Sequence, residues 1–103
     1  MSEIPVIYIN SEEDEEKYLK EYKFSIHQKI LKSVEKSFKD NIDSIELFQI
    51  VNRLRGFTFI VMVEKSSWVD SLEKCLMFFQ ETEEYELCEK TLNLINVIKK
   101  DEK

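Results

Sequence analysis

Residues 72–98 constrain the fold most, because they contain two amphipathic helical patterns separated by a turn of only a few residues. The whole chain has one glycine and one proline, so its connections must be short and must use ordinary backbone geometry. Apolar residues recur at helical spacing on both sides of this turn, namely Trp68, Leu72, Cys75, Leu76 and Phe79 before it and Tyr85, Cys88, Leu92 and Ile95 after it. We therefore predict an antiparallel helical hairpin over residues 66–100.

The length and composition are typical of one small folded domain. A chain of 103 residues can bury one hydrophobic core but not two, so we predict a single domain over 1–103. No apolar run approaches the roughly 20 residues that cross a bilayer, and the acidic N-terminal segment is unlike a secretory signal. Two cysteines are too few for a disulfide framework. These features favour a cytoplasmic protein with no membrane association.

The segment 44–63 allows two interpretations. Residues 57–63 are aromatic and β-branched with no helical stripe, which indicates a buried strand that needs a partner. An antiparallel strand at 44–51 would supply this partner, with 52–56 as the hairpin loop. In the alternative, 44–55 is helical and the protein is all-α, because Gly56 is placed to end a helix.

We choose the hairpin and predict an α+β fold. It contains an N-terminal helix, a central β-hairpin at about 44–51 and 57–63, and a C-terminal antiparallel helix pair packed over one sheet face.

The N-terminal third begins with a short apolar segment. Residues 4–9 suit an edge strand, which Pro5 favours, or else residues 1–10 form a flexible arm. Ser11 followed by Asp14 in an acidic run indicates a helix start. Ser25 with Gln28 forms a second capping box, so we expect one long or kinked helix, or a new helix at that point.

Charge is unevenly distributed along the chain. Residues 1–16 hold six acids and no bases, whereas residues 17–39 hold seven lysines and two glutamates. Four lysines step by three, four and three positions, which predicts a basic stripe on one helix side. Two arginines fall on the predicted hairpin loop, where arginine can contact carboxylates or phosphates bidentately, and Trp68 or Tyr22 can add stacking. The candidate partner-binding residues are Lys29, Lys32, Lys36, Lys39, Arg53, Arg55 and Trp68.

The C-terminal quarter resembles the UVR motif, the helical hairpin of the excision-repair proteins UvrB and UvrC and of several bacterial adaptor proteins. The matching residues are Leu72 with Glu73, Leu76, Tyr85 with Glu86, Cys88 and Ile95. Glu89 replaces the second small residue of that family, and Leu92 with Asn93 stand where an arginine and an aspartate are typical. The resemblance implies a hairpin used for protein–protein docking.

The sequence lacks the signatures of common enzymes. A single glycine excludes a glycine-rich phosphate loop, and neither Gly-x-Ser-x-Gly nor His-Glu-x-x-His occurs. His27 is the one histidine, so a triad or a zinc cluster would have to combine it with helix-borne cysteines. We expect Cys75 and Cys88 to pack in the core. We predict no enzymatic activity, no cofactor and no metal site.

These observations favour a non-enzymatic protein–protein interaction module, an adaptor or inhibitor of a larger protein. A small protein encoded by a phage or a mobile element would fit. One alternative is nucleic-acid binding through the Lys29 to Lys39 stripe, although the sequence pI of about 4.9 argues against it. Another alternative is acidic mimicry of nucleic acid. The uncharged segment 57–63 would promote aggregation if exposed, so we expect it to be covered within the chain or by a second copy in a homodimer.

Overall fold

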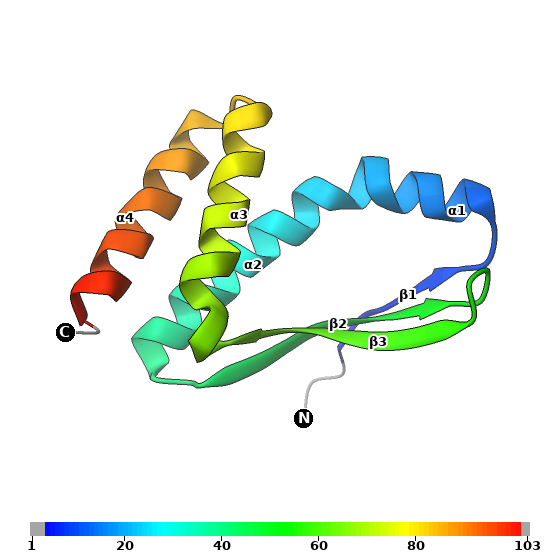
Figure 1. Cartoon of the computed structure of the whole chain (residues 1–103), viewed down its shortest axis with the longest axis horizontal. Coiled ribbons are helices and arrows are strands. Elements are labelled where there is room, and N and C mark those ends of the chain that lie inside the picture. The colour runs from blue at the N-terminus through cyan, green and yellow to red at the C-terminus, as the bar shows by residue number, and fades with distance from the viewer. Residues whose placement is uncertain (1–3, 102–103) are drawn as a thin grey trace.

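The computed structural model describes residues 4–101. A short strand is followed by a long helical segment, a β-hairpin and a pair of helices (Figure 1). The elements are β1 (Val6–Ile9), α1 (Glu12–Lys17), the π-helical turn η1 (Tyr18–Tyr22), α2 (Lys23–Asp40), β2 (Ser44–Asn52), β3 (Phe57–Glu64), the 3-10 turn η2 (Lys65–Ser67), α3 (Trp68–Glu81) and α4 (Tyr85–Asp101). The predicted α+β fold is confirmed, and the all-α alternative with 44–55 helical is wrong.

The three strands form one sheet in the order β1-β2-β3. β2 and β3 pair antiparallel across the predicted hairpin, and β1 adds to the other side of β2 in the parallel direction. The hairpin turns at Gly56, whose φ of +78° suits a residue without a Cβ atom. The register shifts between Glu46 and Phe48, so Leu47 forms a bulge that has no partner in β3. The sheet therefore has two edges, a four-residue one at β1 and an eight-residue one at β3.

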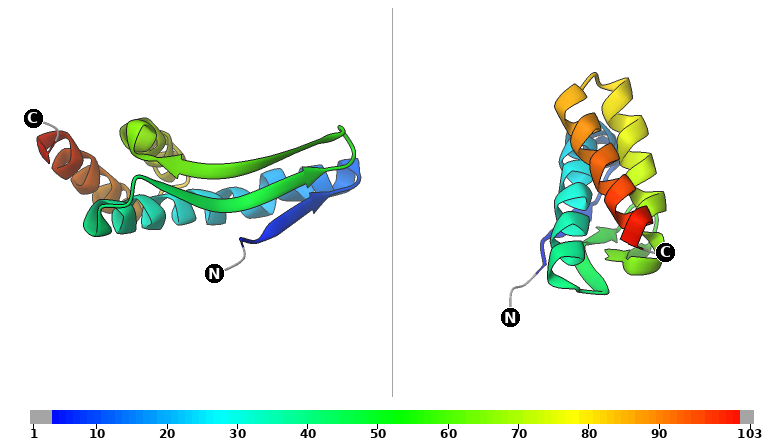
Figure 2. Two further views of the ribbon diagram at one scale, coloured as in Figure 1. Left: turned by 90° about the horizontal axis from the view of Figure 1, so that it is seen from below. Right: turned by 90° about the vertical axis from the view of Figure 1, so that its left-hand side faces the viewer.

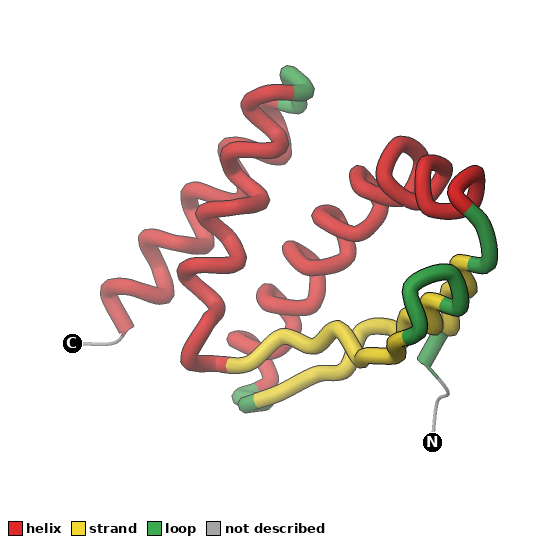
Figure 3. The backbone as a smooth tube through the Cα atoms, turned by 45° about the vertical axis from the view of Figure 1, so that its right-hand side comes forward, coloured by secondary structure: helices red, strands yellow, loops and turns green. Residues whose placement is uncertain are grey.

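The N-terminal helical segment lies on one side of the sheet (Figure 3). Its predicted start is confirmed, because Ser11 accepts a hydrogen bond from the Asp14 amide and the Asp14 carboxylate accepts one from the Asn10 amide. The segment passes through the π-helical turn η1 into α2, so it is long and irregular rather than newly capped at Ser25. It ends at Asn41, which adopts the left-handed conformation.

The core joins the inner sheet face, α2 and the helical hairpin. Its buried apolar residues are Ile9, Leu31, Val34, Leu47, Phe48, Ile50, Val63, Trp68, Leu72, Cys75, Phe79, Ile95 and Ile98. The predicted helical hairpin is confirmed as α3 and α4, which lie side by side (Figure 1). We expected this pair over a sheet face, but it packs against α2 at one end of the sheet. The reason is the three-residue turn η2, which starts α3 directly at the end of β3.

Candidate protein interface

The sheet has one covered face and one open face. Residues paired across strands lie on the same side of a sheet, so the register assigns each residue to a face. The inner face, which includes Phe48 and Ile50, is buried under the helices. Seen from below in Figure 2, no helix of the described residues 4–101 covers the other side. We call that side the outer face, and its residues are Val6, Tyr8, Gln49, Val51, Thr58, Ile60 and Met62, followed at the α3 end by Glu46, which pairs with Met62, and by the pair Ser44 and Glu64.

The outer face is apolar where a solvent-facing strand surface is usually polar. Five of the first seven are hydrophobic, and the charged residues of this face, Glu46 and Glu64, stand at its α3 end. The Tyr8 residue is 52% exposed, Ile60 is 45% exposed and Met62 is 42% exposed. Single exposed apolar residues are ordinary, but a contiguous apolar surface on a small protein marks a place where another molecule docks.

β3 is exposed on its inner side as well. Figure 2 shows this strand lying to one side of the long helical segment, which covers β1 and β2. Phe57 and Phe59 point to the inner side, yet both rings are more than two-fifths exposed and stack with centroids 5.6 Å apart. A shallow groove of about 210 Å³ separates them from Leu19 on η1. The predicted strand at 57–63 is confirmed and Val63 is buried, but the predicted burial is wrong for residues 57–60 and Met62, because the helices do not reach the strand's outer edge.

Arg53 lies at the hairpin end of the outer face. Its guanidinium carbon sits 4.9 Å from the centroid of the Tyr8 ring, a cation–π distance, and its Nη1 lies 3.4 Å from the Asn10 side-chain oxygen. Arginine and tyrosine are the residue types that most often dominate binding energy at protein interfaces. Among the loop residues predicted to bind a partner, Arg53 is the one that borders this apolar surface.

Arg55 is engaged within the chain. Its Nε and Nη2 donate to the two carboxylate oxygens of Glu15 at 3.1 and 2.9 Å. These hydrogen bonds hold the pKa of Glu15 below its ordinary value and raise the pKa of Arg55. The pair ties the hairpin loop to α1, so this predicted partner-binding residue serves a structural contact.

The predicted lysine stripe lies on α2 with all four residues exposed: Lys29, Lys32, Lys36 and Lys39. The Lys29 ammonium donates to the Leu47 carbonyl at 2.9 Å, which satisfies a backbone acceptor at the β-bulge. Within residues 4–101, the other three lysines make no ion pair. The stripe is therefore basic and solvated, with one member committed to the fold.

Trp68 does not belong to any surface. We predicted it as a partner-binding residue, and this is wrong because it is only 4% exposed and begins α3 inside the core. Its ring packs edge-on against Phe38 with centroids 6.3 Å apart. The helical spacing of the apolar residues, which places Trp68 on the apolar stripe of α3, agrees with this burial.

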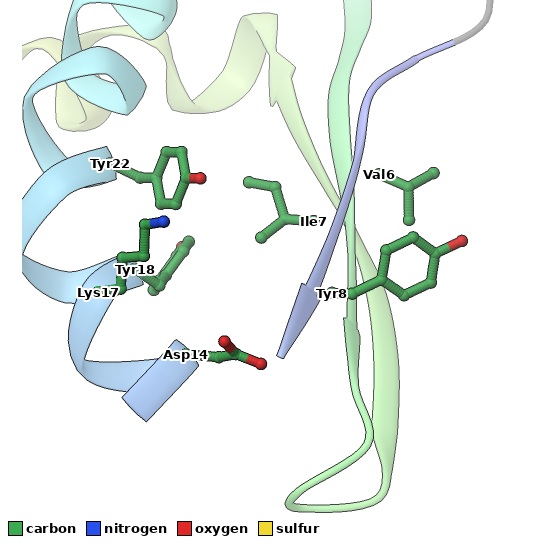
Figure 4. Close-up of a pocket in the computed structure, with 7 residues that line it drawn as sticks. All are labelled: Val6, Ile7, Tyr8, Asp14, Lys17, Tyr18 and Tyr22. Carbon is green, nitrogen blue, oxygen red and sulfur yellow. The ribbon is translucent and has the colours of Figure 1, made fainter. Parts of the chain in front are cut away.

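A hollow of about 430 Å³ lies between the first helical turns and β1 (Figure 4). Asp14, Lys17, Tyr18 and Tyr22 project from the helical segment toward β1, and Ile7 projects toward them. Val6 and Tyr8 point the other way, onto the outer face. Burial raises the pKa of Tyr18. The Asp14 carboxylate is already engaged in the local fold, because it accepts a hydrogen bond from the Asn10 amide.

The thiol and imidazole groups pack within the helical layer. Cys75 is fully buried and burial raises its pKa to about 11, so its thiol is held in the unreactive neutral form. Cys88 is a free, half-buried thiol. His27 stacks on Phe78 at 4.2 Å between centroids, and its Nδ1 lies 2.7 Å from the Lys23 carbonyl. These groups act as packing residues.

The outer face was missed as a site by sequence reasoning, although a signal for it existed. Residues 4–9 and 57–63 are apolar at both alternating positions, which is normal for a strand buried on two sides. The helices of residues 4–101 are too few to cover two sheet faces once α3 and α4 are paired with α2. An uncovered apolar face follows from that count.

No protein-family model, no curated protein and no solved structure matches this chain. The resemblance of residues 72–98 to the UVR motif therefore stays a prediction. In the described part of the chain, no helix has the length and apolar character needed to cross a membrane.

Proposed function

We propose that this protein is a non-enzymatic protein–protein interaction module, an adaptor or inhibitor that docks on a larger protein through its outer face. The observation that carries the proposal is a largely apolar outer face, left open by every described helix, whose charged residues lie at its α3 end. Covering such a surface is favourable because each apolar area removed from water contributes to the free energy of binding.

The rim of the face indicates the chemistry of the partner. Arg53 stands at the hairpin end, and two exposed acids, Glu46 and Glu64, stand at the α3 end. A partner with a flat apolar surface, a carboxylate facing Arg53 and a basic group facing the acids would match this pattern. Such charges at a rim select the partner and its orientation more than they add affinity.

The decisive experiment compares two lysine substitutions in affinity capture from cell extract. Tyr8→Lys places a charge in the outer face, whereas Met77→Lys places one on α3, where Met77 is 61% exposed. Both variants should stay folded because both positions are largely solvated. We expect the wild-type chain and Met77→Lys to recover the same stoichiometric protein, and Tyr8→Lys to lose it.

The matched pair also tests the competing location of the interface. The UVR resemblance supports docking through α3 and α4, whose exposed residues include Met77, Tyr85 and Leu92. Loss of the partner from Met77→Lys with retention by Tyr8→Lys would move the interface to the helical hairpin. Repeated recovery of no protein by a folded wild-type chain would contradict the proposal as a whole.

Nucleic-acid binding is the second candidate, and the exposed lysines without ion pairs favour it. A phosphate backbone could follow Lys32, Lys36 and Lys39 along one side of α2. This function requires an affinity that falls steeply as salt concentration rises and that is lost in the Lys32→Glu, Lys36→Glu double variant. Absence of binding to DNA and RNA at low salt would remove it.

A further inference from the structure

The two edges of the sheet are protected to different degrees. Native proteins prevent edge-to-edge association by short edge strands, prolines, charged residues or a covering element. β1 has four paired residues and follows Pro5, so it carries two of these protections. β3 is twice as long and has no charged residue, proline or glycine from Phe57 to Val63. Its backbone edge is the open one.

The side chains of β3 are apolar on both faces of the sheet. Phe57 and Phe59 are exposed on the inner side, and Ile60 and Met62 on the outer side. A strand that added to this edge would therefore find apolar neighbours above and below it, as well as unpaired backbone groups alongside. The occupant must itself be an uncharged apolar strand, because a charge opposite these residues would be desolvated without a partner.

We propose that the occupant is β3 of a second copy, paired antiparallel across a two-fold axis. β3 of a second copy is itself such a strand, and antiparallel pairing brings the hairpin loop of one copy, which carries Arg53, beside Glu64 at the end of β3 in the other. Parallel pairing would instead set the arginines against each other. Because both copies use the same edge in this isologous pairing, no third chain can add there, and the assembly is a closed dimer.

The dimer would join the two three-stranded sheets into one six-stranded sheet. An axis perpendicular to the sheet leaves both outer faces on the same side, and both Tyr8 residues remain exposed. This inference goes beyond the docking function, because it uses the edge of β3 rather than the outer face at β1. The assembled protein would offer a larger partner two equivalent surfaces.

The test measures mass in solution by light scattering across a concentration series. The chain mass is 12.4 kDa, and we expect twice this value for the wild-type protein at high concentration. Ile60→Lys puts like charges near the axis and should give the monomer mass. Met62→Lys, at a second exposed position of the same strand, should do the same if Ile60→Lys does not fold. Far-UV circular dichroism checks the fold of each variant.

Tyr8→Lys and Met77→Lys are the controls, and both should keep the dimer mass. A wild-type mass of 12.4 kDa at every concentration overturns the proposal, as do polydisperse masses larger than a dimer. A dimer that survives both β3 variants overturns it too. Loss of the dimer in Tyr8→Lys would mean that the outer faces stack on each other, which is a different assembly.

Discussion

Ile50 and Ile60 are the same residue type on opposite faces of the sheet, and truncating each to alanine tests which face is covered. Ile50 is 2% exposed and Ile60 is 45% exposed. Ile→Ala removes three carbons, which at roughly 0.8 kcal/mol per buried group is about 2.4 kcal/mol before the cavity left behind is added. We therefore expect Ile50→Ala to lower the free energy of unfolding by about 3 kcal/mol.

Ile60→Ala should lower the free energy of unfolding by about 1 kcal/mol, since about half of the side chain is already in water and no closed cavity forms. Urea unfolding followed by tryptophan fluorescence measures both changes, and repeating it at several protein concentrations separates the stability of the monomer from that of any assembly. Equal losses for the two variants in dilute solution would refute the assignment of the outer face as uncovered.

Three further predictions concern buried or paired groups. The pKa of Cys75 in the folded protein is raised to about 11, so the neutral thiol stabilises the fold below the ordinary thiol pKa, and this contribution is lost as pH rises toward 11. Between pH 8 and pH 10.5, the free energy of unfolding should therefore fall less for Cys75→Ala than for the wild-type chain. The pKa of Glu15 is lowered, so its pair with Arg55 stabilises the fold above the ordinary carboxyl pKa and stabilises it less at acid pH. The difference in free energy of unfolding between the wild-type chain and Glu15→Gln should therefore shrink as pH falls. A difference that stays constant with pH would contradict the pairing. Lys29→Met should destabilise the protein by about 1 kcal/mol because the Leu47 carbonyl loses its donor, whereas Lys32→Met should leave urea stability nearly unchanged.

The elements that could be predicted from the sequence are those encoded by local periodicity. The helical hairpin follows from stripes in α3 and α4, and the start of α1 follows from Ser11 and Asp14. The β-hairpin required one further argument, because 44–55 also fits a helical pattern. That argument was the need of β3 for a hydrogen-bonding partner, and it gave the right answer.

The features that could not be predicted depend on how whole elements are placed. The parallel addition of β1 to β2 joins residues more than forty positions apart, and no local pattern encodes it. Exposure of β3 depends on the long helical segment lying over β1 and β2 instead. Trp68 and Arg55 carry the right chemistry for a binding site, but packing and an ion pair use them within the fold.

The most direct test of the central claim is hydroxyl-radical labelling of Tyr8 and Met77 in the dilute protein, and again in complex with the protein that it captures. Both side chains are more than half exposed, so we predict that both are labelled readily in the free chain. In the complex, Tyr8 should become protected while Met77 is labelled at the same rate. Protection of Tyr8 in the free monomer, or unchanged labelling of Tyr8 in the complex, would contradict an open outer face that docks on another protein.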